Sequence, residues 1–311
     1  MGVMTLSPGM QAASGEHVDL QATPPPITSH SGDPSTQVQG MEVPHAAMRR
    51  TVSAWLALDV VGQADLLISL AVASGSYTVD EQLVITHDGQ PLAAEEAPMR
   101  HGARVHRCRA GSGRIEVRYD ATITGRDGPQ AVPPADLVEY LRPSRYAECD
   151  KLMAFAMDLF GGLQGTDCLR AIEAWVNSRI AYVSGSSDHT DGAVDTLLTR
   201  CGVCRDYAHL VIGLLRALAV PARLVACYAP GLSPMDFHAV VEACVDGQWH
   251  VLDATRLAPR VTMLRISTGR DAADTAFLSS YGGTVTVVGM EVTATSDGDL
   301  PYDDGSLVSM G

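Results

Sequence analysis

The feature that most constrains the fold is a two-residue turn, Asp246-Gly247, between two apolar segments. Residues 238–245 precede the turn and residues 248–253 follow it. Asp-Gly is typical of a tight hairpin turn, because both central positions need a positive φ and both residue types tolerate it. We therefore expect an antiparallel pair of strands here.

The register of this hairpin decides which side chains can meet. If Val245 faces Gln248, then Val240 faces Asp253. His238 lies two residues from Val240, and because side chains alternate along a strand it shares a sheet face with Asp253. Diagonal neighbours of this kind are roughly 7–8 Å apart at Cα, which allows a hydrogen bond between a histidine and a carboxylate.

A helix is predicted ahead of the hairpin, because apolar residues after Cys204 recur at three- and four-residue spacing. They are Tyr207, Leu210, Val211, Leu214, Leu215 and Leu218. We expect the helix to begin near Gly202 or Val203 and to end before Pro221, which disfavours helical geometry in its predecessor. Cys204 then lies in the first turn, where unpaired backbone N–H groups and the helix dipole stabilise a thiolate and can bind an oxyanion.

Three residues of this region are the candidate catalytic residues. A thiol acts as a nucleophile when it is ionised, and it needs a base whose tautomer is fixed by a third group. We expect Cys204 to be the nucleophile, His238 the general base and acid, and Asp253 the group that orients the imidazole. The alternative for His238 and Asp253 is a buried pair without chemistry.

Cys201 and Cys204 also form a Cys-x-x-Cys pair, for which a redox or zinc function is the alternative. A structural zinc site needs four ligands, and the sequence contains no second pair of this kind. We therefore expect one catalytic cysteine with an incidental neighbour, no metal and no cofactor. The cysteine count, seven, is odd, which favours free thiols over a disulfide framework.

Composition narrows the range of partners and compartments. The 311 residues are 46% hydrophobic, enough for a sizeable core, and the net charge of −14 argues against nucleic acid and anionic membranes as partners. No apolar run approaches the roughly 20 residues that cross a bilayer, and no signal-peptide pattern opens the sequence. We expect a cytoplasmic protein; its oligomeric state is not indicated.

Four segments are predicted along the chain. Residues 1–45 are rich in proline and polar residues and are expected to form a disordered tail. Residues 46–128 are β-rich and suit a small antiparallel β-sandwich, followed by a linker at 125–134. Residues 135–295 are expected to form the catalytic core, and residues 296–311 an acidic C-terminal tail.

The expected elements give an α+β fold, with a small antiparallel β domain ahead of a mixed core. Strands are predicted at 52–61, 66–73, 77–86, 104–109, 114–124 and 222–228, and further helices at 145–160, 166–182 and 194–198.

The motifs of the core resemble the transglutaminase-like superfamily of papain-type thiol enzymes, in particular bacterial proposed cysteine proteases with a β-rich N-terminal region. The resemblance covers roughly residues 50–290. It rests on Gly202-Val203-Cys204-Arg205-Asp206-Tyr207-Ala208-His209-Leu210, Arg216-Ala217-Leu218-Ala219-Val220-Pro221-Ala222-Arg223, Phe237-His238-Ala239 and Trp249-His250-Val251-Leu252-Asp253-Ala254-Thr255. Two positions depart from the family pattern: Ala219 replaces a usual glycine and Val240 a usual tryptophan.

This resemblance implies a papain-like core in which the helix carrying the nucleophile packs on an antiparallel sheet. It also implies a protease, amidase or acyltransferase that transfers the acyl group of a peptide or small-molecule donor to water or an amine. Two alternatives remain open: an acyltransferase that moves an acyl group from a carrier thioester to an amine, and a scaffold protein of the same fold without catalysis.

Overall fold

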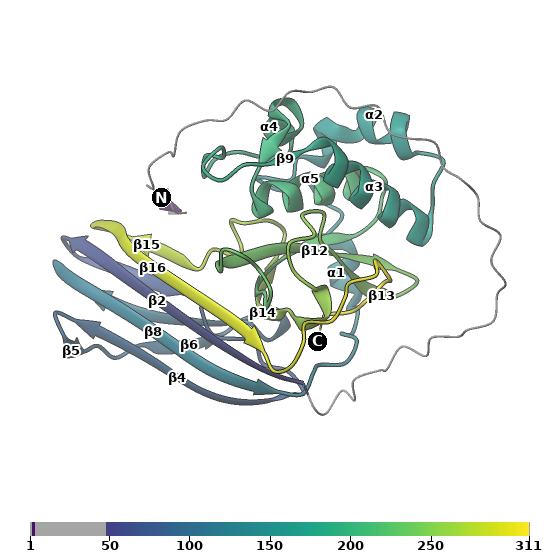
Figure 1. Ribbon diagram of the computed structural model, residues 1–311. Helices are drawn as coiled ribbons and strands as arrows, with labels where there is room; N and C mark the ends of the chain where they lie inside the picture. Colours follow the sequence, from purple (N-terminus) through teal and green to yellow (C-terminus); the bar gives the residue numbers. More distant parts are fainter. Residues whose placement is uncertain (1, 4–47, 311) are drawn as a thin grey trace, which may run out of the picture.

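The computed structural model describes residues 2–3 and 48–310, and these form an α+β fold (Figure 1). The predicted fold class is confirmed: helices and an antiparallel sheet make up the core, and a β region precedes it. Residues 1 and 4–45 of the predicted N-terminal tail lie outside the described part, so that prediction stays open. Among the described residues, no helix is both long and apolar enough to cross a membrane.

The N-terminal β region consists of two antiparallel sheets. One has the order β16-β2-β8-β4-β5, with bounds Thr284–Ser296, Arg49–Val61, Gly113–Thr124, Thr78–His87 and Gln90–Pro91. The other has the order β1-β15-β3-β7-β6, with bounds Gly2–Val3, Leu278–Tyr281, Ala64–Ile68, Arg104–Ala110 and Glu95–Pro98. Alternate residues of β8, from Ile115 to Ile123, are buried, as expected of a strand with one face in a core.

The boundary expected at residue 295 is wrong, because two late strands belong to these sheets. β16 pairs along its length with β2, and β15 pairs with β3 and β1. The β region is therefore built from strands that precede the core in the sequence and strands that follow it. Local periodicity cannot reveal such a pairing, since the two partners are separated by the whole core.

The core contains five α-helices and a four-stranded sheet among its described residues (Figure 1). The helices are α1 (Pro134–Glu139), α2 (Cys149–Phe160), α3 (Gly165–Arg179), α4 (Ala193–Thr199) and α5 (Cys204–Ala217). The antiparallel sheet has the order β13-β12-β11-β14, with bounds Gln248–Leu252, Phe237–Val245, Ala222–Tyr228 and Leu264–Gly269. Short strands β9 (Ala181–Tyr182) and β10 (Cys201–Gly202) pair in parallel, so the helix expected at 166–182 ends at Arg179.

Helices α2 to α5 lie on one side of this sheet, with α5 packed directly on β11 and β12 (Figure 1). The other helices cover α5, which is buried over nearly its whole length. The sheet also shares a hydrophobic cluster with the N-terminal β region through Tyr228, Leu264 and Ile266. The Tyr228 hydroxyl donates to the carbonyl of Leu70 at 2.9 Å, which ties the two parts together.

The hairpin between β12 and β13 has the predicted register. Val245 pairs with Gln248, and the ladder continues to Val241 opposite Leu252. Asp246 and Gly247 form the turn with φ values of 52° and 73°. This pairing positions the end of β13 beside the start of β12.

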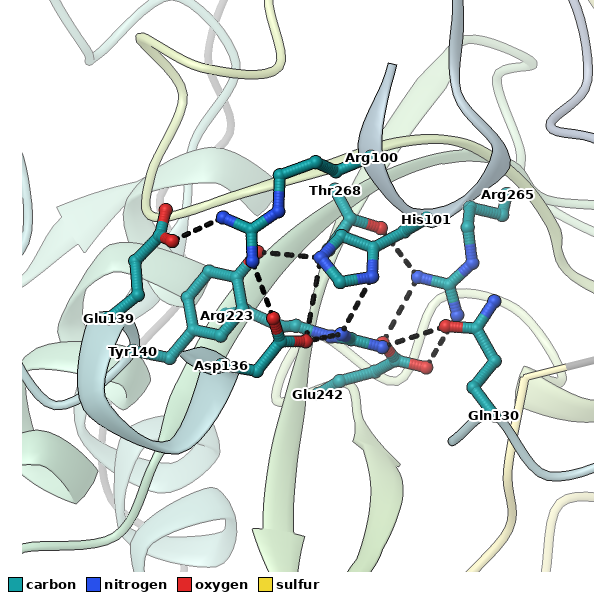
Figure 2. A network of polar contacts seen from close by, with 10 residues as sticks. All are labelled: Arg100, His101, Gln130, Asp136, Glu139, Tyr140, Arg223, Glu242, Arg265 and Thr268. Carbon is teal, nitrogen blue, oxygen red and sulfur yellow. Dashed lines mark hydrogen bonds and ion pairs between the residues drawn. The ribbon is translucent and has the colours of Figure 1, made fainter. Parts of the chain in front are cut away.

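A buried charge network ties β12 to the adjacent strand β11 and, beyond it, to β14 (Figure 2). Glu242 accepts hydrogen bonds from Arg223 of β11 at 2.8 Å and from Arg265 of β14 at 2.6 Å. Burial alone would raise the pKa of Glu242, but Arg265 and Arg223 lower it to about 2. A buried carboxylate with two guanidinium partners holds three strands in one alignment, because a shift of β12 would leave charges unpaired.

The same network reaches the segments that cross this face of the sheet (Figure 2). Arg223 also contacts Asp136 of α1 at 3.2 Å and Gln130 of the linker at 2.9 Å. His101, from the short 3-10 helix Arg100–Gly102, lies within 3.3 Å of Arg223. The network thus connects the β region, the linker and the core sheet.

The predicted C-terminal tail, residues 296–311, is also wrong for the described part, because these residues pack on the core. Val251 of β13 donates its N–H to the carbonyl of Val308 at 2.8 Å. Arg260, in the 3-10 helix Arg260–Thr262, binds Asp303 at 2.6 Å, and Met310 is buried. The buried Arg260 gives Asp303 a partner of opposite charge.

Candidate active site

Cys204 is the first residue of α5 and is partly accessible to solvent. Asp206, two residues further on, accepts the N–H of Val203 at 2.8 Å and so caps the start of the helix. Gly202 is needed at this start, since a Cβ atom there would lie 2.6 Å from the Cβ of Asp206. The local interpretation of Asp206 as a capping residue fits this geometry, and Cys204 is held at the positive end of the helix.

His238 and Asp253 meet as the hairpin register predicts. Nε2 of His238 lies 2.9 Å from Oδ2 of Asp253, and both side chains are almost fully buried. Nδ1 of His238 is buried and has no hydrogen-bond partner among the described residues. The Cys204 thiol lies close enough to the imidazole ring of His238 to raise its pKa. The structure therefore brings the three predicted site residues together.

The electrostatics of the pair favour an ion pair. Burial alone would lower the pKa of His238, but the Asp253 carboxylate and the Cys204 thiol raise it to about 10. Burial would also raise the pKa of Asp253, and the opposing effects of His238 and Thr255 leave it lowered. A protonated imidazole at neutral pH is the form that stabilises a neighbouring thiolate.

Further residues hold Asp253 in place. Thr255 donates both its hydroxyl, at 2.6 Å, and its N–H, at 3.0 Å, to Oδ1 of Asp253. Glu173 of α3 accepts the backbone N–H of Asp253 at 2.8 Å, and burial raises the pKa of this carboxyl. Asn177, one turn further along α3, donates to the carbonyl of Ala254 at 2.8 Å. The segment after β13 is thus anchored to a helix.

Cys204 and His238 line a cavity of about 190 Å³. Most of the other side chains around it are apolar, among them Leu224, Ala226, Phe237, Ile266 and Phe277. The N-terminal β region contributes Ser69. If a substrate carbonyl group reacts with Cys204, the chain attached to that carbonyl would therefore lie in a largely apolar cavity.

His209 has a supporting position and does not belong to the cavity lining. It is fully buried in α5, stacks on Tyr146 with ring centroids 5.3 Å apart, and accepts the N–H of Ala272 at 3.2 Å. Burial lowers the pKa of His209 well below its ordinary value, so it is a neutral acceptor. Because Ala272 lines the cavity, His209 positions one of its walls.

The second cysteine of the Cys-x-x-Cys pair, Cys201, is a free and partly accessible thiol in β10. Within residues 2–3 and 48–310, no group of three or more His, Cys, Asp or Glu side chains could hold a metal ion.

Sequence reasoning missed three residues near the site: Ser69, Glu173 and Tyr182. Tyr182 comes beside Cys204 because β9 pairs with β10, and burial together with the Cys204 thiol raises the pKa of its hydroxyl. Ser69 and Glu173 reach the site from other elements. No motif marks these positions, since each depends on a contact between distant segments.

Comparisons with known proteins identify the family of this chain. The family model of the transglutaminase-like superfamily matches residues 155–254, a range that includes all three predicted site residues. A solved structure of a proposed cysteine protease from Cytophaga hutchinsonii is 34% identical, covers 84% of this chain and 96% of its own, and has a TM-score of 0.75. The chain belongs to the transglutaminase-like superfamily.

Curated relatives come from mycobacteria. An uncharacterised protein of Mycobacterium leprae is 26% identical over 172 residues, which span 50% of this chain and 60% of that protein. An uncharacterised protein of Mycobacterium tuberculosis is 37% identical over 70 residues, or 22% of this chain and 21% of that protein. The match thus spans less than two thirds of either curated relative.

The structure shows the surroundings of the two residues, Ala219 and Val240, that depart from the superfamily pattern. Ala219 follows α5 with a φ of 59°, the left-handed conformation that favours glycine. Val240 is buried in a cluster with Val225 and Val251 on the core sheet. The valine therefore contributes to packing behind the site.

Proposed function

We propose that this transglutaminase-like protein is a thiol enzyme that transfers the acyl group of an amide or ester through a thioester on Cys204. Cys204 is the nucleophile, His238 is the general base and acid, and Asp253 orients and stabilises the imidazolium. The acyl donor is a peptide or a small molecule.

In the first half of the reaction, the Cys204 thiolate attacks the carbonyl carbon of the donor, with its former proton on His238. Backbone N–H groups at the start of α5 stabilise the oxyanion that forms. The carbon–nitrogen or carbon–oxygen bond then breaks, and the leaving amine or alcohol takes the proton from His238. The products of this half are the leaving group and a thioester on Cys204.

In the second half, water or an amine attacks the thioester while His238 removes the proton of the attacking group. The carbon–sulfur bond breaks, Cys204 leaves as a thiolate, and the protonated His238 is restored as its partner. Water gives a carboxylic acid and an amine gives an amide, so the same residues serve hydrolysis and transfer.

The observation that carries the proposal is the position of His238. Its Nε2 atom is 2.9 Å from the Asp253 carboxylate, and its ring lines the cavity that also contains Cys204. The kinship with a proposed cysteine protease from Cytophaga hutchinsonii supports the same chemistry.

The test is acylation of the intact protein by 4-nitrophenyl esters. Wild-type protein should release 4-nitrophenolate and gain the mass of one acyl group, which peptide mapping should locate on Cys204. Cys204→Ala should abolish both signals, whereas Cys201→Ala, the matched control, should retain them. Loss of labelling in Cys201→Ala with labelling retained in Cys204→Ala would contradict the assignment and favour the Cys-x-x-Cys interpretation.

The same preparation distinguishes the acceptors and the donors. Adding glycine amide or an alkylamine should divert the thioester to an amide product if transfer is the second step. Acylation by a carrier thioester together with inertness toward simple esters and amides would favour the carrier-dependent acyltransferase. Absence of any adduct, with Cys204 also inert toward iodoacetamide at neutral pH, would favour the scaffold.

A further inference from the structure

Ser69 of the N-terminal β region lines the cavity that contains Cys204 and His238. It directly follows β3 and is only 4% exposed. Its backbone N–H donates to the carbonyl of Phe277 at 2.9 Å, which fixes the residue beside another part of the cavity wall. Ser69 therefore has a rigid place at the site.

The hydroxyl of Ser69 has no hydrogen-bond partner among the residues that the structure describes. Buried hydroxyl groups are nearly always paired, and an unpaired one calls for a specific explanation. Two buried polar atoms of the lining share this condition, Oγ of Ser69 and Nδ1 of His238. The second belongs to the proposed reaction, which suggests that the first also meets the substrate.

The remaining lining limits what the substrate can be. The charged groups have other partners: Arg205 binds Ser187 at 2.6 Å, and Asp236 is exposed and accepts the N–H of Phe237. The cavity volume of about 190 Å³ lies below the roughly 300–1,000 Å³ of pockets for drug-sized ligands. A short apolar acyl chain suits this space, because most of the lining side chains are apolar.

We propose that Ser69 is a substrate-binding residue, and that the acyl group transferred to Cys204 is a short apolar chain with one uncharged polar atom that hydrogen-bonds to Ser69. This inference rests on the proposed function, since it assumes acylation at Cys204. It makes the N-terminal β region a part of the active site. A carbonyl or carboxamide oxygen on the acyl chain is the polar atom that the serine hydroxyl would bind.

The test compares two acyl donors that differ at one position, 4-nitrophenyl 4-oxopentanoate and 4-nitrophenyl pentanoate. The first carries a ketone oxygen where the second carries a methylene group. The ratio of their kcat/KM values should favour the oxo ester in the wild type. Ser69→Ala should lower this ratio roughly three- to tenfold, the range expected for one uncharged hydrogen bond.

Ser267→Ala is the matched control. Ser267 is buried at a similar level, but its hydroxyl donates to the carbonyl of Thr275 at 3.4 Å and it does not line the cavity. This variant should lose thermal stability and keep the wild-type ester ratio. Ser69→Ala should keep or gain thermal stability, because the hydroxyl that it removes has no protein partner.

The outcomes separate the two proposals. If neither ester acylates Cys204 in the wild type, the proposed function fails. If both esters acylate Cys204, the triad stands, and the inference on Ser69 is overturned by an unchanged ratio in Ser69→Ala, by an equal loss with both esters, or by a wild-type preference for pentanoate.

Discussion

The two oxygens of Asp253 have separate partners: Oδ2 lies 2.9 Å from Nε2 of His238, and Oδ1 accepts the Thr255 hydroxyl at 2.6 Å. The carboxylate therefore cannot rotate without losing one contact or the other. Because His238 is held through Nε2, its Nδ1 atom is the one left for the proton exchange with Cys204 that we propose. In the proposed reaction, the orientation of the base is thus set by a residue outside the cavity lining.

Asp253→Asn should retain the fold and lower the acylation rate, by analogy with serine triads on the order of 10⁴-fold. The amide can keep its oxygen toward Thr255, but its NH₂ group then faces Nε2 and favours the wrong tautomer. Stopped-flow release of 4-nitrophenolate measures the rate, and circular dichroism checks the fold. Thr255→Val, which loses one anchor of the carboxylate, should have a much smaller effect; an equal loss would contradict this account.

Cys204 should be the thiol most rapidly alkylated by iodoacetamide at pH 7. Burial raises the pKa of five other thiols, Cys108, Cys149, Cys168, Cys227 and Cys244. Cys201 is partly accessible, as Cys204 is, but the described part of the chain provides no hydrogen bond from a histidine to it. Peptide mapping after a short exposure should find the label on Cys204, and His238→Gln should slow labelling there without changing Cys201. Faster labelling of Cys201 in the wild type would contradict the prediction.

The Glu242 network should make stability fall in acid. The pKa of Glu242 is lowered from 4.5 to about 2 in the folded protein, so the unfolded state binds the proton more tightly. Its contribution is present above pH 4.5 and is lost as the pH falls through about 2. On the order of 3 kcal/mol of unfolding free energy depends on this group. Urea unfolding between pH 2 and 6 measures the loss.

Glu242→Gln is the control for the acid effect. It should be several kcal/mol less stable at pH 6, because Arg265 loses its counter-charge and Arg223 keeps that of Asp136 alone. Its stability should then depend less on pH between 2 and 4.5 than that of the wild type. Parallel pH curves for the two proteins would show that other carboxylates dominate.

Ala219→Gly should stabilise the protein by about 1 kcal/mol. Ala219 has a φ of 59° and sits where α5 ends, with Val220 donating its N–H to the carbonyl of Leu215. Glycine adopts this left-handed conformation without strain. Ala217→Gly, the same exchange inside the helix, should destabilise by about 1 kcal/mol. Chemical denaturation of both variants gives the comparison, and equal signs would refute the argument.

The local part of the site could be predicted from the sequence because its geometry depends on short-range rules. Helical spacing gave the start of α5 within a residue or two, and the Asp246-Gly247 turn determined which residues of β12 and β13 are paired. The proximity of His238 and Asp253 follows from that pairing alone. The fold class followed from the same patterns.

Contacts between distant segments could not be predicted in this way. Glu173, in a helix whose periodicity was recognised, gave no sign that its carboxylate would hold the backbone of Asp253. No local sequence pattern distinguishes Ser69 from the other serines; the packing of the β region on the core places it at the cavity. The acidic composition of residues 296–311 likewise gave no indication that Asp303 would form an ion pair with Arg260.

The pairing of β2 with β16 has a consequence for biosynthesis. β2 leaves the ribosome before the core does, whereas β16, which covers its edge from Val61 to Arg50, leaves after the core. Throughout the synthesis of the core, β2 must carry an open edge that another chain could occupy. The thirteen residues of β2 are therefore open to misassembly while the core is being made.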